Sequence, residues 1–205
     1  MMSGTSSRVA DSTLRDRQRD LTRRLLIDAF AHVILRDGIH DISMQAVADE
    51  AGCSLRTLYR YFPSREALVT GLDDEMRSFL TSCLDRLPPD VRDDLVEFAE
   101  RVPVLLDQRH DLVRAWVSTD PTSELRGFVS GHVRALVEAA VDRTAPSLSP
   151  DERARAVAGI RLIATSRTWV SLTEHLSAED AAVTMGWIIR TLLADLANGG
   201  GPRAD

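Results

Sequence analysis

Residues 51–68 have the sequence AGCSLRTLYRYFPSREAL, and the arrangement of the N-terminal part of this 205-residue chain follows from them. Gly52 supplies the left-handed conformation that ends a helix without steric strain. Ser54 is a preferred N-cap for a helix from residue 55 to about 61, and Pro63-Ser64 ends that helix and begins another. The stretch therefore predicts two short helices joined by a glycine-containing turn, which is a helix-turn-helix.

The outward face of the second predicted helix carries cationic and hydroxyl-bearing side chains and no acid. Phosphate contacts require donors of these types, whereas a solvated helix face usually mixes positive and negative charges. In the helix-turn-helix unit the second helix lies in the major groove of DNA. We therefore predict that this unit binds DNA; the alternative is one helical hairpin in an all-helical protein. The residues on this face are Arg56, Thr57, Tyr59, Arg60 and Tyr61.

Arg56 is the side chain that we expect to contact a base, because one guanidinium can donate to both acceptors of guanine. The alternatives are a phosphate contact or a salt bridge with Asp49 or Glu50 in the preceding helix. Tyr59 and Tyr61 lie two residues apart on one helix, so they cannot both face the core and at least one should reach DNA. The expected core members nearby are Leu58 and Phe62.

The composition is typical of a soluble globular protein, with 44% hydrophobic and 27% charged residues, and we expect a cytoplasmic location. No apolar run approaches the roughly 18 residues of a membrane span, so we expect no membrane partner. The N-terminus is polar and lacks the pattern of a signal peptide. The net charge of −6 is uneven, since residues 1–65 carry ten Arg against eight acids and residues 66–205 carry fifteen against twenty-three. A mildly basic N-terminal part on an acidic body suits a DNA-binding protein with a local field.

Motifs of catalysis and of metal binding are missing from the sequence. Cys53 and Cys83 form no CxxC pair and have no histidine partners at metal spacing, so we expect no metal and no cofactor. No HExxH, GxSxG, Walker or dinucleotide-binding motif is present, and the nearest lookalike, residues 127–132, has the wrong glycine spacing. We therefore expect no catalytic residue and no enzyme. A protein-interaction module is the other alternative class.

The apolar spacing is helical nearly everywhere, which predicts an all-α protein of about nine helices. An N-terminal three-helix helix-turn-helix domain would precede a larger helical domain, to which the resemblance described below assigns effector binding and dimerisation. The expected boundaries are a disordered tail at 1–13, the DNA-binding domain at 14–64, the larger domain at 65–198 and a flexible tail at 199–205. The first expected helix ends at residue 37. The other eight span about 43–51, 55–61, 65–87, 90–108, 110–118, 121–143, 150–175 and 178–197.

The stretch from about residue 22 to 72 closely resembles the N-terminal domain of tetracycline-repressor-like (TetR family) transcriptional regulators. The resemblance implies a homodimer that binds a palindromic operator and usually represses, until a small effector in the variable C-terminal domain releases the DNA. The resemblance does not identify the effector or the regulated genes. Its specific elements are the turn from Ala48 through Ala51-Gly52 to Ser54, the Thr57-Leu58-Tyr59-x-Tyr61-Phe62 run and Ser64-Arg65-Glu66-Ala67-Leu68.

The resemblance also implies site residues by position. Ser43 and Gln45 would touch phosphates, Arg65 replaces a lysine that usually meets phosphate, and Arg23 fits the family's arm contact. Arg56 stands where glycine is frequent in the family, so a base-contacting side chain is gained here. Together with the residues argued above, the predicted DNA-binding set is Arg23, Ser43, Gln45, Ser54, Arg56, Thr57, Tyr59, Arg60, Tyr61 and Arg65.

The last two predicted helices carry apolar residues on more than one face. A helix that is apolar on two sides must be buried twice. The small residues Gly159 and Gly186 would allow close approach between helices. We therefore predict a homodimer through a four-helix interface that these helices form with their symmetry mates; the alternative is a single thick core. The apolar positions of the final helix are Ala182, Met185, Trp187, Ile188, Ile189, Leu192 and Leu196.

Several polar or aromatic residues lie in apolar settings of the larger predicted domain, and they form a candidate pocket for an unknown, partly apolar small-molecule effector. His132 lies on an inward stripe with Leu136, where it is either a satisfied core histidine or a ligand contact. Pro103 interrupts a predicted helix, either as a movable kink or as a plain break. The candidate effector-binding residues are Phe98, Trp116, Phe128, His132, Arg161, Thr165 and Trp169.

Overall fold

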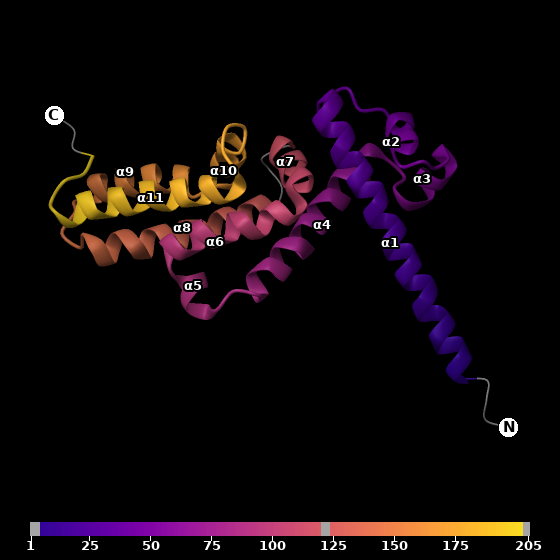
Figure 1. Ribbon diagram of the computed structural model, residues 1–205, viewed down its shortest axis with the longest axis horizontal. Helices are drawn as coiled ribbons and strands as arrows, with labels where there is room; N and C mark the ends of the chain where they lie inside the picture. Colours follow the sequence, from indigo (N-terminus) through magenta and orange to yellow (C-terminus); the bar gives the residue numbers. More distant parts are fainter. Residues whose placement is uncertain (1–4, 120–123, 203–205) are drawn as a thin grey trace. The chain divides into compact units, whose positions relative to one another are not determined.

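The computed structural model describes residues 5–119 and 124–202, and every regular element within them is helical, which confirms the all-α class (Figure 1). No helix of the described residues is long and apolar enough to cross a bilayer. The side chains of residues 5–13, 124–126 and 128 lie outside the description. The helices are α1 (Thr5–Asp37), α2 (Met44–Glu50), α3 (Leu55–Tyr61), α4 (Arg65–Asp85), α5 (Pro89–Asp93), α6 (Leu95–Leu106), a 3-10 turn (Asp107–Arg109), α7 (His110–Ser118), α8 (Glu124–Thr144), α9 (Pro150–Ile163), α10 (Ser166–Leu172) and α11 (Ala178–Ala197).

The chain forms two compact units. The first comprises Met1–Met76 and Arg114–Thr119, and the second comprises Arg77–Val113 and Asp120–Asp205. The first half of α4 therefore belongs with the helix-turn-helix, whereas the sequence placed a domain boundary at residues 64–65. The tails and domain limits expected from the sequence remain predictions.

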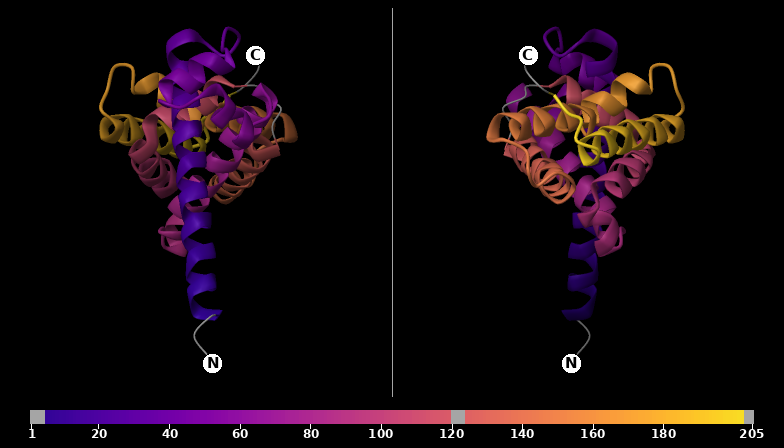
Figure 2. Two further views of the ribbon diagram at one scale, coloured as in Figure 1. Left: turned by 90° about the vertical axis from the view of Figure 1, so that its right-hand side faces the viewer. Right: turned by 90° about the vertical axis from the view of Figure 1, so that its left-hand side faces the viewer.

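In the first unit, α1 is the longest helix, and it packs against α2. Its 33 residues contain neither glycine nor proline, so the helix runs for roughly 50 Å until Gly38, whose φ of 80° ends it. The helix begins at Thr5, inside the stretch for which the sequence led us to expect a disordered tail. Only the part from Leu26 onward is apolar toward the core, with Leu26, Phe30 and Val33 buried. The N-terminal turns of α1 extend outward from the rest of the unit, and the side chains of residues 14–20 are exposed (Figure 2).

The first half of α4 closes the core of this unit. Leu68, Leu72 and Met76 are buried at i, i+4 and i+8 along it. Gly71 lies where α4 comes very close to the ring of Phe62, and a Cβ on Gly71 would be 2.6 Å from Cε1 of that ring. Because that distance is far below a van der Waals contact, only glycine fits there without movement of its neighbours.

The second unit is a helical bundle in which α6 packs along α11, while α8 lies against α9 and α11. Figure 1 shows α6, α8, α9 and α11 running side by side. Pro103 lies buried inside α6, and the helix continues beyond it to Leu106, so Pro103 is not a plain break. The core of the bundle includes Leu95, Val102, Val137, Val141, Ile160, Trp169 and Ile189.

Two helices expected as continuous are each divided by a capping residue, which is why the described residues hold more than the nine helices expected. Asp94 adopts an extended conformation and accepts from the N–H groups of Val96 and Glu97, so α6 starts anew after α5. Thr165 likewise accepts from the N–H of Thr168 and begins α10 after α9. Short polar side chains favour this local hydrogen bond over the helix interior.

Candidate nucleic-acid interface

The turn between α2 and α3 is built around Gly52, which has a φ of 63°. The N–H of Gly52 donates to the carbonyl of Asp49 at 3.0 Å, and the N–H of Cys53 donates to that of Ala48 at 2.9 Å. These bonds satisfy carbonyls at the end of α2 and reverse the chain. Buried Leu58 and Phe62 then hold α3 and its end against the core, as expected from the sequence. The opposite face of α3 is therefore left at the surface.

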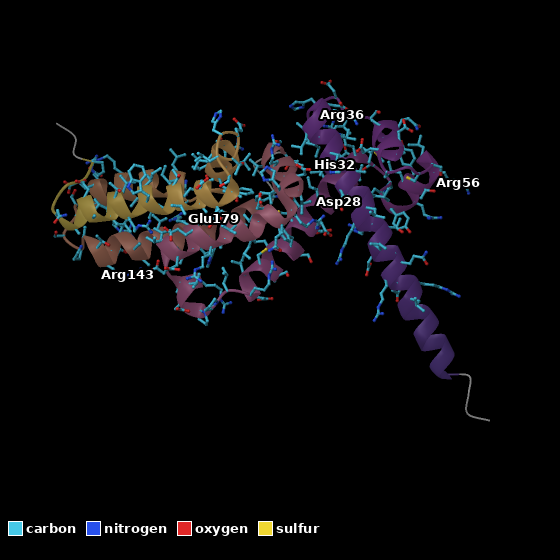
Figure 3. All side chains as sticks on the ribbon, in the orientation of Figure 1. Asp28, His32, Arg36, Arg56, Arg143 and Glu179 are labelled. Carbon is cyan, nitrogen blue, oxygen red and sulfur yellow. The ribbon has the colours of Figure 1, made fainter. Side chains whose placement is uncertain are left out.

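The exposed face of α3 carries Arg56, Tyr59 and Arg60, and Thr57 and Tyr61 lie half-buried beside it. Figure 3 shows Arg56 projecting away from the helix-turn-helix. Tyr59 is 45% exposed, so one of the two tyrosines reaches solvent, as their spacing requires. Arg60 lies over the ring of Tyr61, with Cζ 5.2 Å from the ring centroid. This face presents two guanidinium groups and phenol hydroxyls to a ligand.

The acids that flank α3 are engaged with other residues. Glu50 accepts from Arg36 at 2.8 Å and lies 3.4 Å from the ring nitrogen Nδ1 of His32. Asp49 accepts from the amide of Gln45 at 2.7 Å. In the described part of the chain neither acid forms a salt bridge with Arg56, which was the alternative expected from the sequence.

Arg36 also neutralises the end of α1. It donates to both carboxylate oxygens of Asp37, at 2.8 and 3.0 Å. These hydrogen bonds hold the pKa of Asp37 below its ordinary value and raise the pKa of Arg36. The acids near the helix-turn-helix are thus partly compensated, which lowers their repulsion toward a polyanion.

Ser43 and Ser54, whose hydroxyl groups we expected to contact DNA, are the N-caps of the two short helices α2 and α3. Ser43 accepts from the N–H of Ala46 at 3.0 Å. Ser54 accepts from the N–H of Thr57 at 3.2 Å, and the hydroxyls of Ser54 and Thr57 lie 2.9 Å apart. A hydroxyl that accepts at a cap still has its own proton to donate. Ser43 can therefore cap α2 and bind a phosphate oxygen at once.

Two arginines expected at phosphates contact protein atoms in this structure. Arg65 donates from Nη2 to the carbonyl oxygen of Ile39 and so joins the start of α4 to the loop after α1. Arg23 lies over the ring of Phe62, with Cζ 4.6 Å from its centroid, and donates to Asp74 at 3.4 Å. Both side chains position the unit, and their role at DNA stays a prediction.

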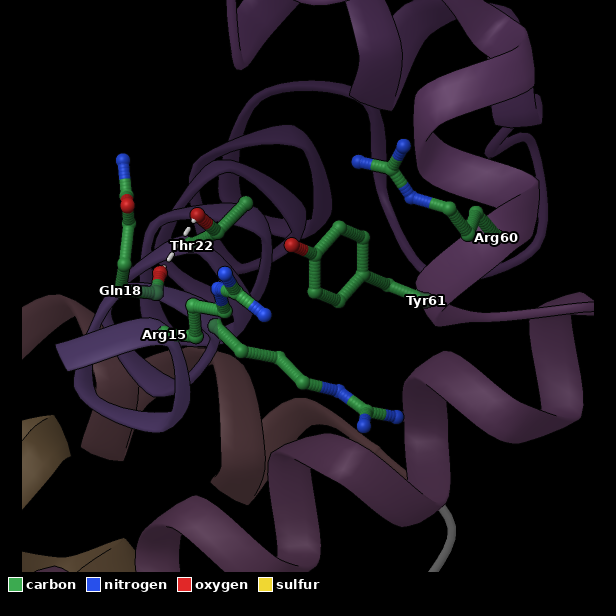
Figure 4. Close-up of a pocket in the computed structure, with 6 residues that line it drawn as sticks. Arg15, Gln18, Thr22, Arg60 and Tyr61 are labelled. Carbon is green, nitrogen blue, oxygen red and sulfur yellow. Dashed lines mark hydrogen bonds between the residues drawn. The ribbon is translucent and has the colours of Figure 1, made fainter. Parts of the chain in front are cut away.

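A cationic pocket of about 500 Å³ lies between α1 and α3 (Figure 4). In the close-up, the ring of Tyr61 points from α3 toward Thr22 of α1. The hydroxyl of Thr22 donates to the carbonyl of Gln18 at 2.8 Å. Four of the lining residues were missed by the sequence analysis, although their i, i+3, i+4, i+7 spacing is a signal that could have found them. The pocket is lined by Arg15, Gln18, Arg19, Thr22, Arg60 and Tyr61.

The second unit brings together some of the residues expected to bind an effector. The rings of Phe98 and His132 lie 5.4 Å apart. Trp169 is fully buried and meets the ring of His110 edge-on at 5.3 Å. Among the described side chains, Nε2 of His132 and Nε1 of Trp169 are buried without a hydrogen-bond partner.

Other candidates for the effector site are placed elsewhere. Trp116 belongs to the first unit, where its indole donates to Asp73. Arg161 is exposed on α9, and Thr165 caps α10. The side chain of Phe128 lies outside the described residues. Within those residues no group of three or more His, Cys, Asp or Glu side chains could hold a metal ion.

A capped helix-turn-helix with an acid-free, cationic second helix defines a DNA-binding protein. A family model described as bacterial regulatory proteins, tetR family, matches residues 26–72. The HTH-type transcriptional regulator MT1294 of Mycobacterium tuberculosis is 32% identical over 149 residues, which cover 68% of this chain and 69% of the relative. The HTH-type transcriptional repressor KstR of the same species is 27% identical over 203 residues, covering 91% and 87%.

Solved structures show the same fold. The TetR family regulator PfmR from Thermus thermophilus superposes with a TM-score of 0.57 at 14% identity, over 82% of this chain and 97% of that one. A TetR regulator from Haloarcula marismortui gives a TM-score of 0.56 at 16% identity, over 89% and 100%.

This chain belongs to the tetR family of bacterial regulatory proteins, and it is a DNA-binding transcriptional regulator rather than an enzyme. Members of the family bind DNA operators and typically form dimers.

Proposed function

We propose that this regulator is a repressor that binds a palindromic operator as a homodimer and is released by a small-molecule effector. The observation that carries the proposal is the exposed face of α3, where Arg56 projects outward and the nearby acids Asp49 and Glu50 are engaged elsewhere. A guanidinium without an acid partner keeps its donors for the two acceptors of guanine. The relatives named as repressors support the direction of regulation.

The surfaces of α9 and α11 support the homodimer. Leu162 on α9 is 67% exposed, and Val183 and Trp187 on α11 are 54% and 61% exposed. The other face of α11 is already buried in its own subunit through Ala182, Met185 and Ile189. We propose that the exposed face packs against the same helices of a second copy, which buries these large apolar groups.

The two small residues expected at that interface differ in their surroundings. Gly159 on α9 is exposed, with no described atom within 4 Å of where its Cβ would be, so a helix of a second copy can approach it. Gly186 on α11 is covered by the side chain of Glu100 from α6 of the same subunit. Gly159 therefore supports the dimer interface, and Gly186 supports the close packing of α6 on α11.

The unpaired polar atoms in the second unit support an effector site. A buried N–H or ring nitrogen that has no hydrogen-bond partner lowers the free energy of unfolding by about 1–3 kcal/mol relative to a hydrogen-bonded one. Nε2 of His132 and Nε1 of Trp169 are two such atoms, and aromatic rings of Phe98 and His110 flank them. We propose that an effector of mainly apolar character with one or two polar groups binds beside them.

The test is selection of bound sequences from random DNA with the purified full-length protein. We expect enrichment of a two-fold symmetric site whose half-site centres lie about 10 bp apart, or a multiple of that spacing. Enrichment of an asymmetric site would contradict binding as a symmetric dimer. Recovery of no preferred sequence would contradict the assignment of α3 as the element that contacts bases.

A further inference from the structure

The N-terminal turns of α1 sort their charges around the helix. Arg15, Gln18, Arg19 and Thr22 follow one another at i, i+3, i+4 and i+7, so they share one face. The acids Asp16 and Asp20 each follow an arginine by one residue, which places them about 100° around the helix from that face. The face that holds Arg15 and Arg19 therefore carries no acid, and the opposite face carries Arg17 and Arg24.

The acid-free face of α1 is the face that lines the pocket shared with α3. Arg60 and Tyr61 of α3 form the other wall, so three guanidinium groups, two hydroxyls and one amide surround a space of about 500 Å³. Figure 4 shows Arg15 and Tyr61 on opposite sides of it. Among the described residues, no carboxylate lines the pocket. A site with three guanidinium groups, neutral polar groups and no carboxylate is suited to a phosphate-type anion.

We propose that this α1–α3 pocket binds a phosphate of the DNA backbone beside the half-site that α3 contacts. The inference rests on the proposed function and adds a second contact element to it, namely the turns of α1 before residue 23. DNA is the favoured source of the phosphate because Arg60 and Tyr61 belong to the same short helix as Arg56. When α3 lies in the major groove, the phosphates that border the groove pass next to its end.

Phosphate binding here supplies affinity and register but no base recognition. The variant that tests it is Arg15→Ala/Arg19→Ala, in which alanine preserves the helix because of its high helix propensity. The matched control is Arg17→Ala/Arg24→Ala, which removes two charges from the same stretch on the opposite face. Operator affinity is measured for the full-length proteins at several salt concentrations.

We expect Arg15→Ala/Arg19→Ala to lower operator affinity at least about tenfold and to flatten the salt dependence by about one unit of slope per subunit, because one phosphate contact is lost. The control double variant should change both quantities far less. Equal losses in both variants would mean that only the general field matters, and that would overturn the pocket. Unchanged binding in both would overturn it as well.

Two further results separate this inference from its alternatives. Inorganic pyrophosphate is titrated calorimetrically into the wild type and into Arg15→Ala/Arg19→Ala. Binding that only the wild type shows, together with equal operator affinity of the two proteins, would assign the pocket to a free anion instead of DNA. If the wild type and all variants failed to prefer any DNA sequence, the proposed function itself would fail, whatever the pocket binds.

Discussion

The indole Nε1 of Trp116 donates to Oδ1 of Asp73 at 2.7 Å, which joins α7 to α4 inside the first unit. Trp116 was expected to line an effector pocket, and the structure instead places its polar atom in a hydrogen bond next to the helix-turn-helix core. Trp116 is 3% exposed, so the bond is shielded from water. A shielded donor needs its acceptor more than an exposed one does.

Replacement of Asp73 should show this dependence. Asp73→Ala leaves the buried indole N–H without that acceptor, and we expect a loss of about 1–3 kcal/mol in the free energy of unfolding. Asp73→Asn keeps an oxygen at the same position and should lose much less. Urea denaturation of both variants measures the difference, and equal losses would mean that the hydrogen bond has no special weight.

Arg56 and Arg65 should affect DNA binding in different ways. Arg56→Ala should relax the preference at one base pair of each half-site, by about 1–3 kcal/mol of discrimination. Arg65→Ala should weaken binding to all sequences evenly and flatten the salt dependence by about one unit of slope. It should also lower stability, because Arg65 donates to the carbonyl of Ile39. If both variants bound operator and non-operator DNA as the wild type does, α3 would not be the recognition helix.

Trp187 should be required for the homodimer. Trp187→Glu places a charge in the centre of the exposed face of α11, where burial against a second copy would strand it without a partner. We expect a monomer by light scattering at micromolar concentration. The control is Val104→Glu, since Val104 is an exposed apolar residue on α6 that the proposed interface does not include. A dimeric Trp187→Glu protein would exclude this face as the interface.

Gly71 and Gly131 should respond oppositely to alanine. At Gly71 a Cβ would lie 2.6 Å from Phe62 and 2.8 Å from Ile27, so Gly71→Ala should destabilise the protein by about 1–3 kcal/mol. At Gly131, inside α8, no described atom lies within 4 Å of that position, and Gly131→Ala should stabilise the helix by about 0.5–1 kcal/mol. Thermal unfolding gives both signs in one series. A Gly71→Ala protein as stable as the wild type would show that α4 can shift without cost.

Asp142 should contribute to the stability of the second unit only above acid pH. Arg153 on α9 donates to both its oxygens, at 2.6 and 2.9 Å, and this holds the pKa of Asp142 below its ordinary value of 3.8. Because the folded state binds the proton less readily, the stabilisation is present above that ordinary value and is lost as the pH falls through the lower pKa of the folded state.

Asp142→Asn should therefore be less stable than the wild type near neutral pH, and the difference should disappear once the pH has fallen below the lowered pKa of Asp142 in the folded state. Urea denaturation across that range measures it. In an Arg153→Ala background the same substitution should make no pH-dependent difference. A difference that persisted in that background would assign the effect to another partner.

The sequence determined the local structure of the DNA-binding unit, because its signals are short-range. Gly52 requires a left-handed turn, and Ser54 begins a helix wherever it lies in the chain. Leu58 and Phe62 were likewise expected in the core next to this turn, and both are buried. Such patterns act within one or two turns of helix, so they can be recognised without knowledge of the rest of the molecule.

Only the tertiary structure decided which distant residues meet. Trp116 is hydrogen-bonded to Asp73, and Arg15 and Arg19 of α1 line a pocket together with residues of α3. In both cases the residues that meet are some forty positions apart in the sequence. The helix breaks at Asp94 and Thr165 also could not be predicted from the sequence, because the same residue type can cap a helix or lie inside one, and tertiary packing decides between the two. Local propensity acts between neighbours along the chain, whereas these contacts arise from the way whole helices are packed.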